Sequence, residues 1–166
     1  TANGTGDSVT VLLGDGAGGA SSSASFAAGD GPQWMSLADV DLDGALDALV
    51  ANEPADAVNL LRGDGRGGLQ PAVEFGVFDD PRCVAGADFD EDGAPYFVSA
   101  TNAFPSTLTV RLGDGAASFG PKNTFQVDGT GSWGSGWVGV AQTDADTHLD
   151  LVVAVTPDRA AGVLRV

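Results

Sequence analysis

The sequence repeats with a period of about fifty residues, and this register restricts the chain to folds built from one recurring unit. Gly-Asp-Gly triplets lie 49 and 50 residues apart, beginning at Gly14, Gly63 and Gly113. A phenylalanine follows each triplet in step, at Phe26, Phe75 and Phe125. A β-sandwich of unrelated strands would not keep such a register, so a repeat architecture is favoured.

Short apolar or alternating runs within each unit are separated by Gly, Asp and Pro, which predicts strands joined by tight turns. The first complete unit predicts four antiparallel strands, at 34–38, 46–51, 57–61 and 69–75. Four strands in about fifty residues are typical of a β-propeller blade. We therefore expect an all-β protein of about three repeats, with units of approximately 1–33, 34–82, 83–136 and 137–166.

The number of repeats also bears on closure of the ring. A propeller usually needs at least ~4 blades to close. The first and last units of this chain hold only part of a blade. We expect a partial ring or a segment of a larger propeller, or a ring that neighbouring subunits complete.

An acidic loop lies between the first two predicted strands of the first complete unit. Asp39, Asp41 and Asp43 alternate along it, Gly44 allows a sharp turn, and Asp47 follows at position nine. Calcium takes six to eight oxygen ligands at ~2.4 Å from carboxylates and carbonyls on such loops. Because four carboxylates within nine residues would repel one another without a cation, the loop predicts a calcium site that fastens two strands.

Two further acidic loops follow in register. The second has Asp88, Asp90 and Asp92, but Tyr96 stands at position nine, so we expect weaker calcium binding. The third loop is more altered, because a threonine replaces the glycine. Its candidate ligands are Gln142, Asp144, Asp146 and Asp150.

The charge of the chain bears on its partners. It has 23 acidic and 7 basic residues, for a net charge of −16. A single Lys and scattered Arg leave no basic patch for phosphates, which excludes nucleic acid as a partner. A salt-adapted acidic surface is an alternative source of this charge. No apolar run approaches the ~18 residues that would predict a transmembrane segment.

Three segments carry a resemblance to a known family. Residues 36–68, 83–93 and 108–121 read SLADVDLDGALDALVANEPADAVNLLRGDGRGG, CVAGADFDEDG and LTVRLGDGAASFGP. Their acidic loops, following apolar strands and Gly-Asp-Gly hairpins resemble the FG-GAP (or VCBS) repeats of integrin-type β-propellers. The resemblance implies four-stranded blades, with calcium held between the first two strands. It also implies a backbone-carbonyl ligand at position seven of each loop, at Ala45, Ala94 and His148.

The resemblance also implies a range of functions. Such repeats serve adhesion, glycan or protein binding, or accompany catalytic domains. We expect a calcium-stabilised binding or scaffold module of a secreted or surface protein, in an extracellular or other non-cytosolic compartment where calcium is abundant. The alternatives are a structural subunit of a larger assembly and an accessory, non-catalytic part of a carbohydrate-active enzyme.

No nucleophile with a base and no phosphate loop is recognisable, so we expect no catalytic residue and no enzyme activity. Trp133, in the Gly-rich stretch 129–136, is the candidate aromatic for stacking on a glycan ligand. The alternative is that Trp133 folds back onto its own blade.

Overall fold

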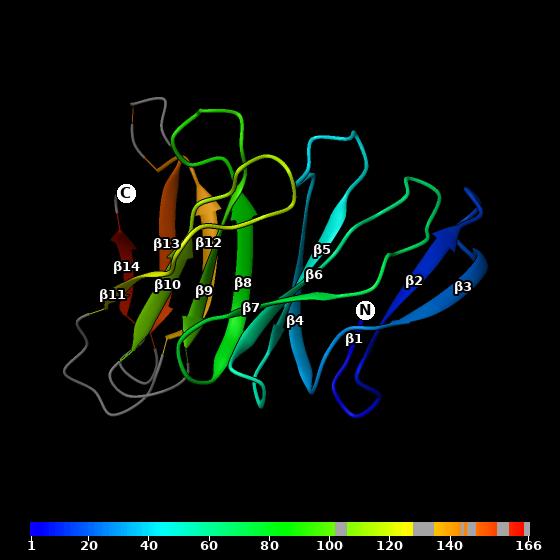
Figure 1. Ribbon diagram of the computed structural model, residues 1–166, viewed down its shortest axis with the longest axis horizontal. Coiled ribbons are helices and arrows are strands. Elements are labelled where there is room, and N and C mark those ends of the chain that lie inside the picture. The colour runs from blue at the N-terminus through cyan, green and yellow to red at the C-terminus, as the bar shows by residue number, and fades with distance from the viewer. Residues whose placement is uncertain (102–105, 128–134, 144, 146–148, 156–159, 165–166) are drawn as a thin grey trace.

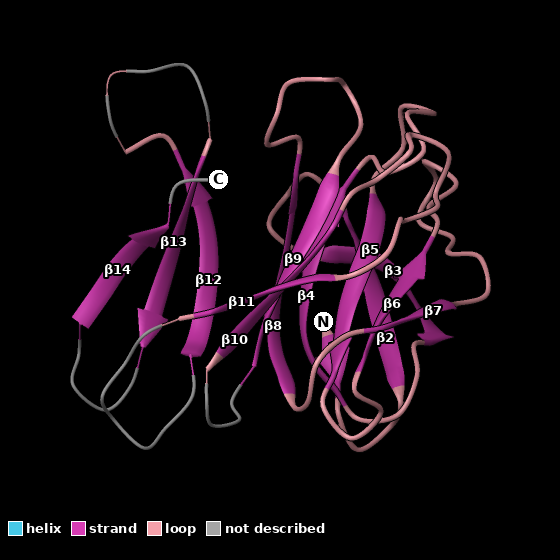
Figure 2. Ribbon diagram, turned by 60° about the vertical axis from the view of Figure 1, so that its left-hand side comes forward, coloured by secondary structure: helices cyan, strands magenta, loops and turns pink. Residues whose placement is uncertain are grey.

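The structure is a computed structural model that describes residues 1–101, 106–127, 135–143, 145, 149–155 and 160–164. Within these residues it contains strands and loops and no helix (Figure 2). The strands form four antiparallel sheets that stand side by side in a row, in which the first and last sheets lie at opposite ends (Figure 1). The predicted all-β fold of antiparallel, propeller-type blades is confirmed.

Within each sheet the strands neighbour one another in chain order. Sheet 1 contains β1 (Ala2–Asn3), β2 (Ser8–Gly14) and β3 (Ala20–Ala27). Sheet 2 contains β4 (Pro32–Ala38), β5 (Asp47–Asn52), β6 (Ala57–Leu61) and β7 (Val73–Gly76). Sheet 3 contains β8 (Pro81–Ala87), β9 (Tyr96–Thr101), β10 (Thr107–Arg111) and β11 (Asn123–Gln126). Sheet 4 contains β12 (Ser135–Ala141), β13 (Asp150–Val155) and β14 (Ala160–Leu164).

The sequence register is also the register of strand pairing. The three phenylalanines that follow the Gly-Asp-Gly turns occupy equivalent positions in β3, β7 and β11. Their partners on the neighbouring strands β2, β6 and β10 are also equivalent, in the pairs Val9↔Phe26, Val58↔Phe75 and Leu108↔Phe125. Each repeat therefore builds the same sheet.

The fourth strand of sheet 2 is shorter than predicted. The apolar pattern predicts a strand over 69–75, whereas β7 begins at Val73. Leu69 makes only an isolated bridge to Gly63. Pro71 follows it and has no N–H to donate to a ladder. The chain therefore crosses from the hairpin to β7 as a loop.

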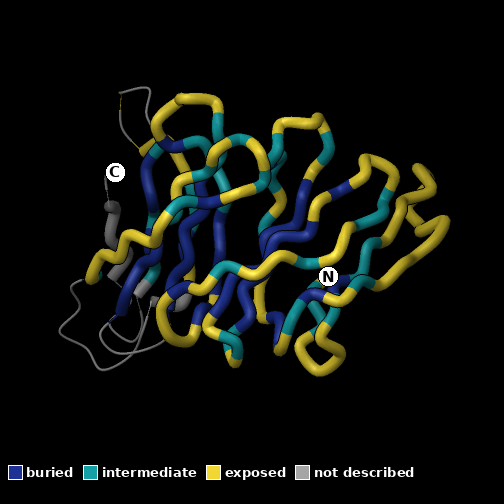
Figure 3. Tube along the Cα trace, viewed as in Figure 1, coloured by how far each residue is buried: buried dark blue, intermediate teal, exposed yellow. Residues whose placement is uncertain are grey.

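The hydrophobic core lies between neighbouring sheets. All six positions of β5 and of β9 are buried, as the dark central segments of Figure 3 show. One cluster joins Leu49 and Leu60 of sheet 2 to Phe97 of sheet 3. Another joins Val98 of sheet 3 to Leu151 of sheet 4. Because β5 and β9 are covered on both faces, they read as continuous apolar runs rather than alternating ones.

Polar side chains of sheets 2 and 3 hold the connections that leave sheets 1 and 2. Ala28, after β3, accepts hydrogen bonds through its carbonyl from the amides of Asn52 and Asn59, at 2.9 and 3.1 Å. Phe78, after β7, donates its N–H to the hydroxyl of Thr109 at 3.3 Å. Asn59 in β6 and Thr109 in β10 are equivalent residues of the repeat, so the same position bonds the incoming connection in sheets 2 and 3.

Candidate metal centre

The fold places each acidic loop at the same end of its sheet, between the first strand and the second. The first loop leaves β4 at Ala38 and enters β5 at Asp47. The second leaves β8 at Ala87 and enters β9 at Tyr96. Because the two flanking strands are paired, the residues of the loop are forced into a compact turn.

The first loop brings three carboxylates together. Asp39, Asp41 and Asp43 each offer an oxygen, and these oxygens lie within 4.8 Å of one another. Asp39 accepts hydrogen bonds from the N–H groups of Asp43 and Gly44, at 3.1 and 3.0 Å. Asp43 accepts one from Ala45 at 2.7 Å. These bonds hold the turn and direct the carboxylates toward a common centre.

Asp41 has one carboxylate oxygen that lacks a protein partner. Its Oδ1 is buried and accepts no hydrogen bond, while its Oδ2 lies 3.7 Å from Nη1 of Arg62. A buried charged oxygen without a partner is costly, by roughly 1–3 kcal/mol or more. A cation at the centre of the loop would remove this cost.

Asp47 has a different role from the other acidic residues of the loop. It is fully buried, and its oxygens accept hydrogen bonds from Val40 at 2.9 Å and from Gly63 at 2.8 Å. Burial raises the pKa of Asp47, and these two hydrogen bonds oppose that rise. Asp47 thus ties the acidic loop to the Gly-Asp-Gly hairpin, and it lies outside the group of three converging carboxylates.

The second loop has an equivalent cluster of three carboxylates, but it has no aspartate that links the loop to the hairpin. Asp88, Asp90 and Asp92 converge within the same 4.8 Å, and Oδ1 of Asp88 is buried without a partner. Tyr96 stands where Asp47 stands in the first loop, and its hydroxyl donates a hydrogen bond to Asp90. This bond raises the pKa of Tyr96 to about 12, and burial adds to the effect.

The third loop is described only in part. Asp150, which begins β13, accepts a hydrogen bond from the N–H of Thr143 at 2.8 Å, as Asp47 does from Val40. Gln142, which directly precedes Thr143, is also described. The other candidates, namely Asp144, Asp146, His148 and Trp133, lie outside the described residues.

The role predicted for Asp47 by position alone is therefore incomplete. The sequence places it at position nine of a ligand pattern, yet its bonds to Val40 and Gly63 are visible only once the hairpin is folded beside the loop. The recurring Gly-Asp-Gly triplet predicts the hairpin that holds Gly63, but no spacing in the sequence predicts the contact of Gly63 with Asp47. Ala45 and Ala94 donate their N–H groups to Asp43 and Asp92, and their carbonyls stay predicted ligands.

The donor set fits a hard divalent cation. Both clusters offer carboxylate oxygens on tight glycine-containing turns, which is the chemistry that calcium prefers. Each cluster also has one buried oxygen with no partner in the protein, at Asp41 and at Asp88. Calcium stays a prediction for both loops.

Comparison with known families gives a match over part of the chain. The sequence profile of the FG-GAP-like repeat matches residues 39–99, from the first acidic loop through the second and into β9. This match confirms the predicted family resemblance. No curated protein is significantly similar to the chain. FG-GAP repeats are β-propeller-type interaction modules that are generally non-catalytic and typical of extracellular proteins. Among the described residues no helix has the length and apolar character that crossing a membrane requires.

Proposed function

We propose that this chain, whose residues 39–99 match the FG-GAP-like repeat, is a calcium-stabilised scaffold of a secreted or cell-surface protein. Its acidic loops bind calcium and thereby lock the first two strands of each sheet. The rigid row of sheets then presents surfaces to a protein or glycan ligand. The metal has a structural role in this proposal, because it bridges residues of one turn rather than facing a reactive group.

The observation that carries the proposal is the pair of matching carboxylate clusters. Each contains three Asp residues with oxygens within 4.8 Å of one another. Each also buries one carboxylate oxygen that the protein leaves without a hydrogen bond. Like charges at this separation destabilise the loop unless a cation lies among them, so calcium should stabilise the folded state.

The direct test is thermal unfolding of the chain with calcium and with excess chelator. At a calcium concentration of ~100 times Kd, binding adds about 2.7 kcal/mol per site. For a chain of this size we expect Tm to rise by about 5–10 °C. Magnesium should give a smaller rise, because it demands stricter octahedral geometry. An unchanged Tm in chelator would contradict the proposal.

Variants assign the effect to the loops. Asp41→Asn combined with Asp43→Asn should remove most of the calcium-dependent rise in Tm. Asp88→Asn should remove a smaller part, because Tyr96 already occupies one oxygen of Asp90. The matched control is Asp79→Asn, which neutralises an exposed carboxylate outside both clusters. If Asp79→Asn reduced the calcium-dependent rise in Tm equally, calcium would be acting by general screening of charge rather than by binding to the loops.

The proposed location and ligand class need tests of their own. Surface exposure predicts that protease added to intact source cells cleaves the protein or that it is recovered from the medium. Recovery only from the cytosol would contradict it. A glycan array screened with the calcium-loaded chain tests the glycan arm, and a silent array would restrict the proposed ligand to protein.

A further inference from the structure

The first acidic loop carries apolar side chains as well as carboxylates. Its three converging aspartates are separated by two apolar residues, Val40 and Leu42. Val40 is 1% exposed. It belongs to the apolar cluster that contains Phe97 of β9 and Phe119, on the connection between β10 and β11. The loop of sheet 2 therefore places a buried side chain among residues of sheet 3.

Leu42 contacts the hairpin of sheet 3 directly. A Cβ added to Gly115, the second glycine of the Gly-Asp-Gly triplet there, would lie 3.1 Å from Cδ1 of Leu42. The leucine thus covers the backbone of this turn. In Figure 1 the connection between β10 and β11 reaches toward the loop between β4 and β5. The loop of sheet 2 meets sheet 3 at two points, one inside the core and one at the surface.

The backbone of the turn, rather than burial, sets the direction of the Leu42 side chain. Leu42 has φ +59°, in the left-handed region that bulky residues rarely occupy. Its side chain is 55% exposed, so burial in the core does not force this conformation. Glu91, the equivalent residue of the second loop, has φ +61°. The conformation therefore belongs to the turn that gathers the carboxylates, and any change in this turn moves Leu42.

The second loop also inserts an apolar residue toward the following sheet. Phe89 stands between two of its aspartates, as Val40 does in the first loop. Phe89 is 4% exposed and shares an apolar cluster with Val138 and Leu151 of sheet 4. Both loops thus combine a group of carboxylates with a contact to the next sheet.

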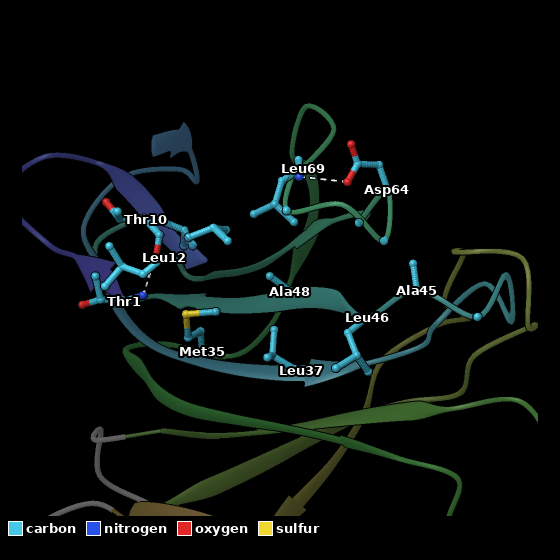
Figure 4. A pocket seen from close by; sticks show the side chains of 17 residues that line it. Thr1, Thr10, Leu12, Met35, Leu37, Ala45, Leu46, Ala48, Asp64 and Leu69 are labelled. Atoms are coloured by element: carbon cyan, nitrogen blue, oxygen red, sulfur yellow. Dashed lines mark hydrogen bonds between the residues drawn. The ribbon is translucent and has the colours of Figure 1, made fainter. Parts of the chain in front are cut away.

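The far end of the first loop packs instead on its own sheet. A Cβ on Gly63 would lie 2.2 Å from the carbonyl oxygen of Leu46, and one on Gly65 would lie 3.6 Å from Cβ of Ala45. Figure 4 shows Ala45 and Leu46 near the hairpin that carries Asp64. One end of the loop is therefore fixed to sheet 2, while Val40 and Leu42 reach sheet 3.

We propose that calcium in the first acidic loop fastens sheet 3 to sheet 2. This inference rests on the proposed calcium binding and adds a role beyond locking two strands of one sheet. Without a cation the three carboxylates repel one another and loosen the turn. Because Val40 and Leu42 alternate with these carboxylates, a loosened turn withdraws both from sheet 3. A cation that gathers the carboxylates holds both side chains against the neighbouring sheet.

The test follows amide hydrogen exchange by residue, with saturating calcium and with excess chelator. Asp88→Asn and Asp92→Asn first disable the second loop, because that loop belongs to sheet 3 itself. Calcium should slow exchange of the loop N–H groups of residues 43–45, which bond to Asp39 and Asp43. It should also slow, by at least about tenfold, exchange of the N–H groups of Asp114 and Ser118, which are bonded within the hairpin of sheet 3.

Variants at the two contacts assign the effect on the hairpin. Leu42→Asn keeps the left-handed turn, which asparagine tolerates, but removes the side chain that covers Gly115. Alone it should reduce the slowing in the hairpin at least about threefold, and combined with Val40→Ala it should leave less than about twofold. At saturating calcium both should retain the slowing within residues 43–45. The matched control is Glu91→Asn, at the equivalent position of the second loop, which should leave both effects unchanged.

Two results would overturn this inference while leaving calcium binding intact. Calcium could slow exchange within residues 43–45 but not in the hairpin of sheet 3. Alternatively, the hairpin effect could survive the combined Val40 and Leu42 variants, or fall equally with Glu91→Asn. If calcium slowed exchange in neither place, calcium binding by the first loop would itself be contradicted, and the inference would fall with it.

Discussion

Tyr96 and Asp47 show how one repeat position can serve two chemistries. Asp47 accepts hydrogen bonds from two backbone N–H groups and is fully buried. Tyr96, at the same place in the next repeat, donates its hydroxyl proton to Asp90 instead. The second loop therefore satisfies one of its carboxylates with a neutral group. In the first loop Asp41 instead lies 3.7 Å from Arg62, and the proposed cation would neutralise the remaining charge.

The chain has a single tyrosine, so its titration can be read without overlap. The hydrogen bond to Asp90 raises the pKa of Tyr96 to about 12. We expect the tyrosinate absorbance of the folded, chelator-treated chain to appear with a midpoint near this value. Because the folded pKa is raised, the stabilisation is complete below about pH 10 and is lost as pH rises toward 12. Asp90→Asn should lower the midpoint, and an unchanged midpoint would contradict the assignment.

At the scale of the element, the Gly-Asp-Gly hairpins are held by their own aspartates. Asp64 accepts hydrogen bonds at 2.8 Å from the N–H groups of both Arg66 and Gly68. Asp15 and Asp114 make the equivalent bonds. Asparagine or aspartate is favoured in such turns because its side chain mimics a backbone carbonyl. The recurring triplet is thus a turn signal with a local mechanism.

These bonds give the hairpin a dependence on acid. Hydrogen bonds from Arg66 and Gly68 lower the pKa of Asp64 below the ordinary 3.8. The stabilisation is present above that value and is lost as pH falls through the lowered pKa. The Tm difference between the native chain and Asp64→Asn should therefore shrink as pH falls below about 4. Arg66→Gln should keep most of this dependence, because the charge of Arg66 contributes less than the backbone bonds. A difference that stays constant with pH would contradict the mechanism.

The elements also show what the sequence can and cannot predict. Strand order, the hairpins and the clustering of Asp39 with Asp41 follow from local pattern, since turn chemistry and pairing are set within one repeat. The start of β7 is predicted wrongly, because the apolar Leu69 indicates a strand although Pro71 follows it. The bonds of Asp47 and Tyr96 depend on neighbours brought by folding. They cannot be read from spacing alone.

For the whole molecule, the net charge of −16 acts against the compact state. Ion pairs between described residues join Arg62 to Asp41 and Arg82 to Glu53. Because 23 acidic residues face 7 basic ones in the sequence, basic side chains are too few to neutralise most of the acidic charge. We expect Tm in chelator to rise as monovalent salt increases from about 0.05 to 1 M, because screening shortens the range of repulsion. The control compares potassium chloride with sodium chloride at equal ionic strength, and the two salts should raise Tm by the same amount. A Tm that falls or stays level would show that the repulsion is unimportant.

The position of the core between the sheets has a consequence for how such a chain is assembled. One repeat encodes one sheet, but the apolar seam that stabilises it is shared, half from each neighbour, as between Leu49 of β5 and Phe97 of β9. A single sheet released from the row would expose apolar side chains on both faces. Stability therefore depends on several adjacent sheets rather than on one repeat. Duplicating one repeat adds one sheet and one seam together, so such a protein can lengthen while its existing seams stay intact.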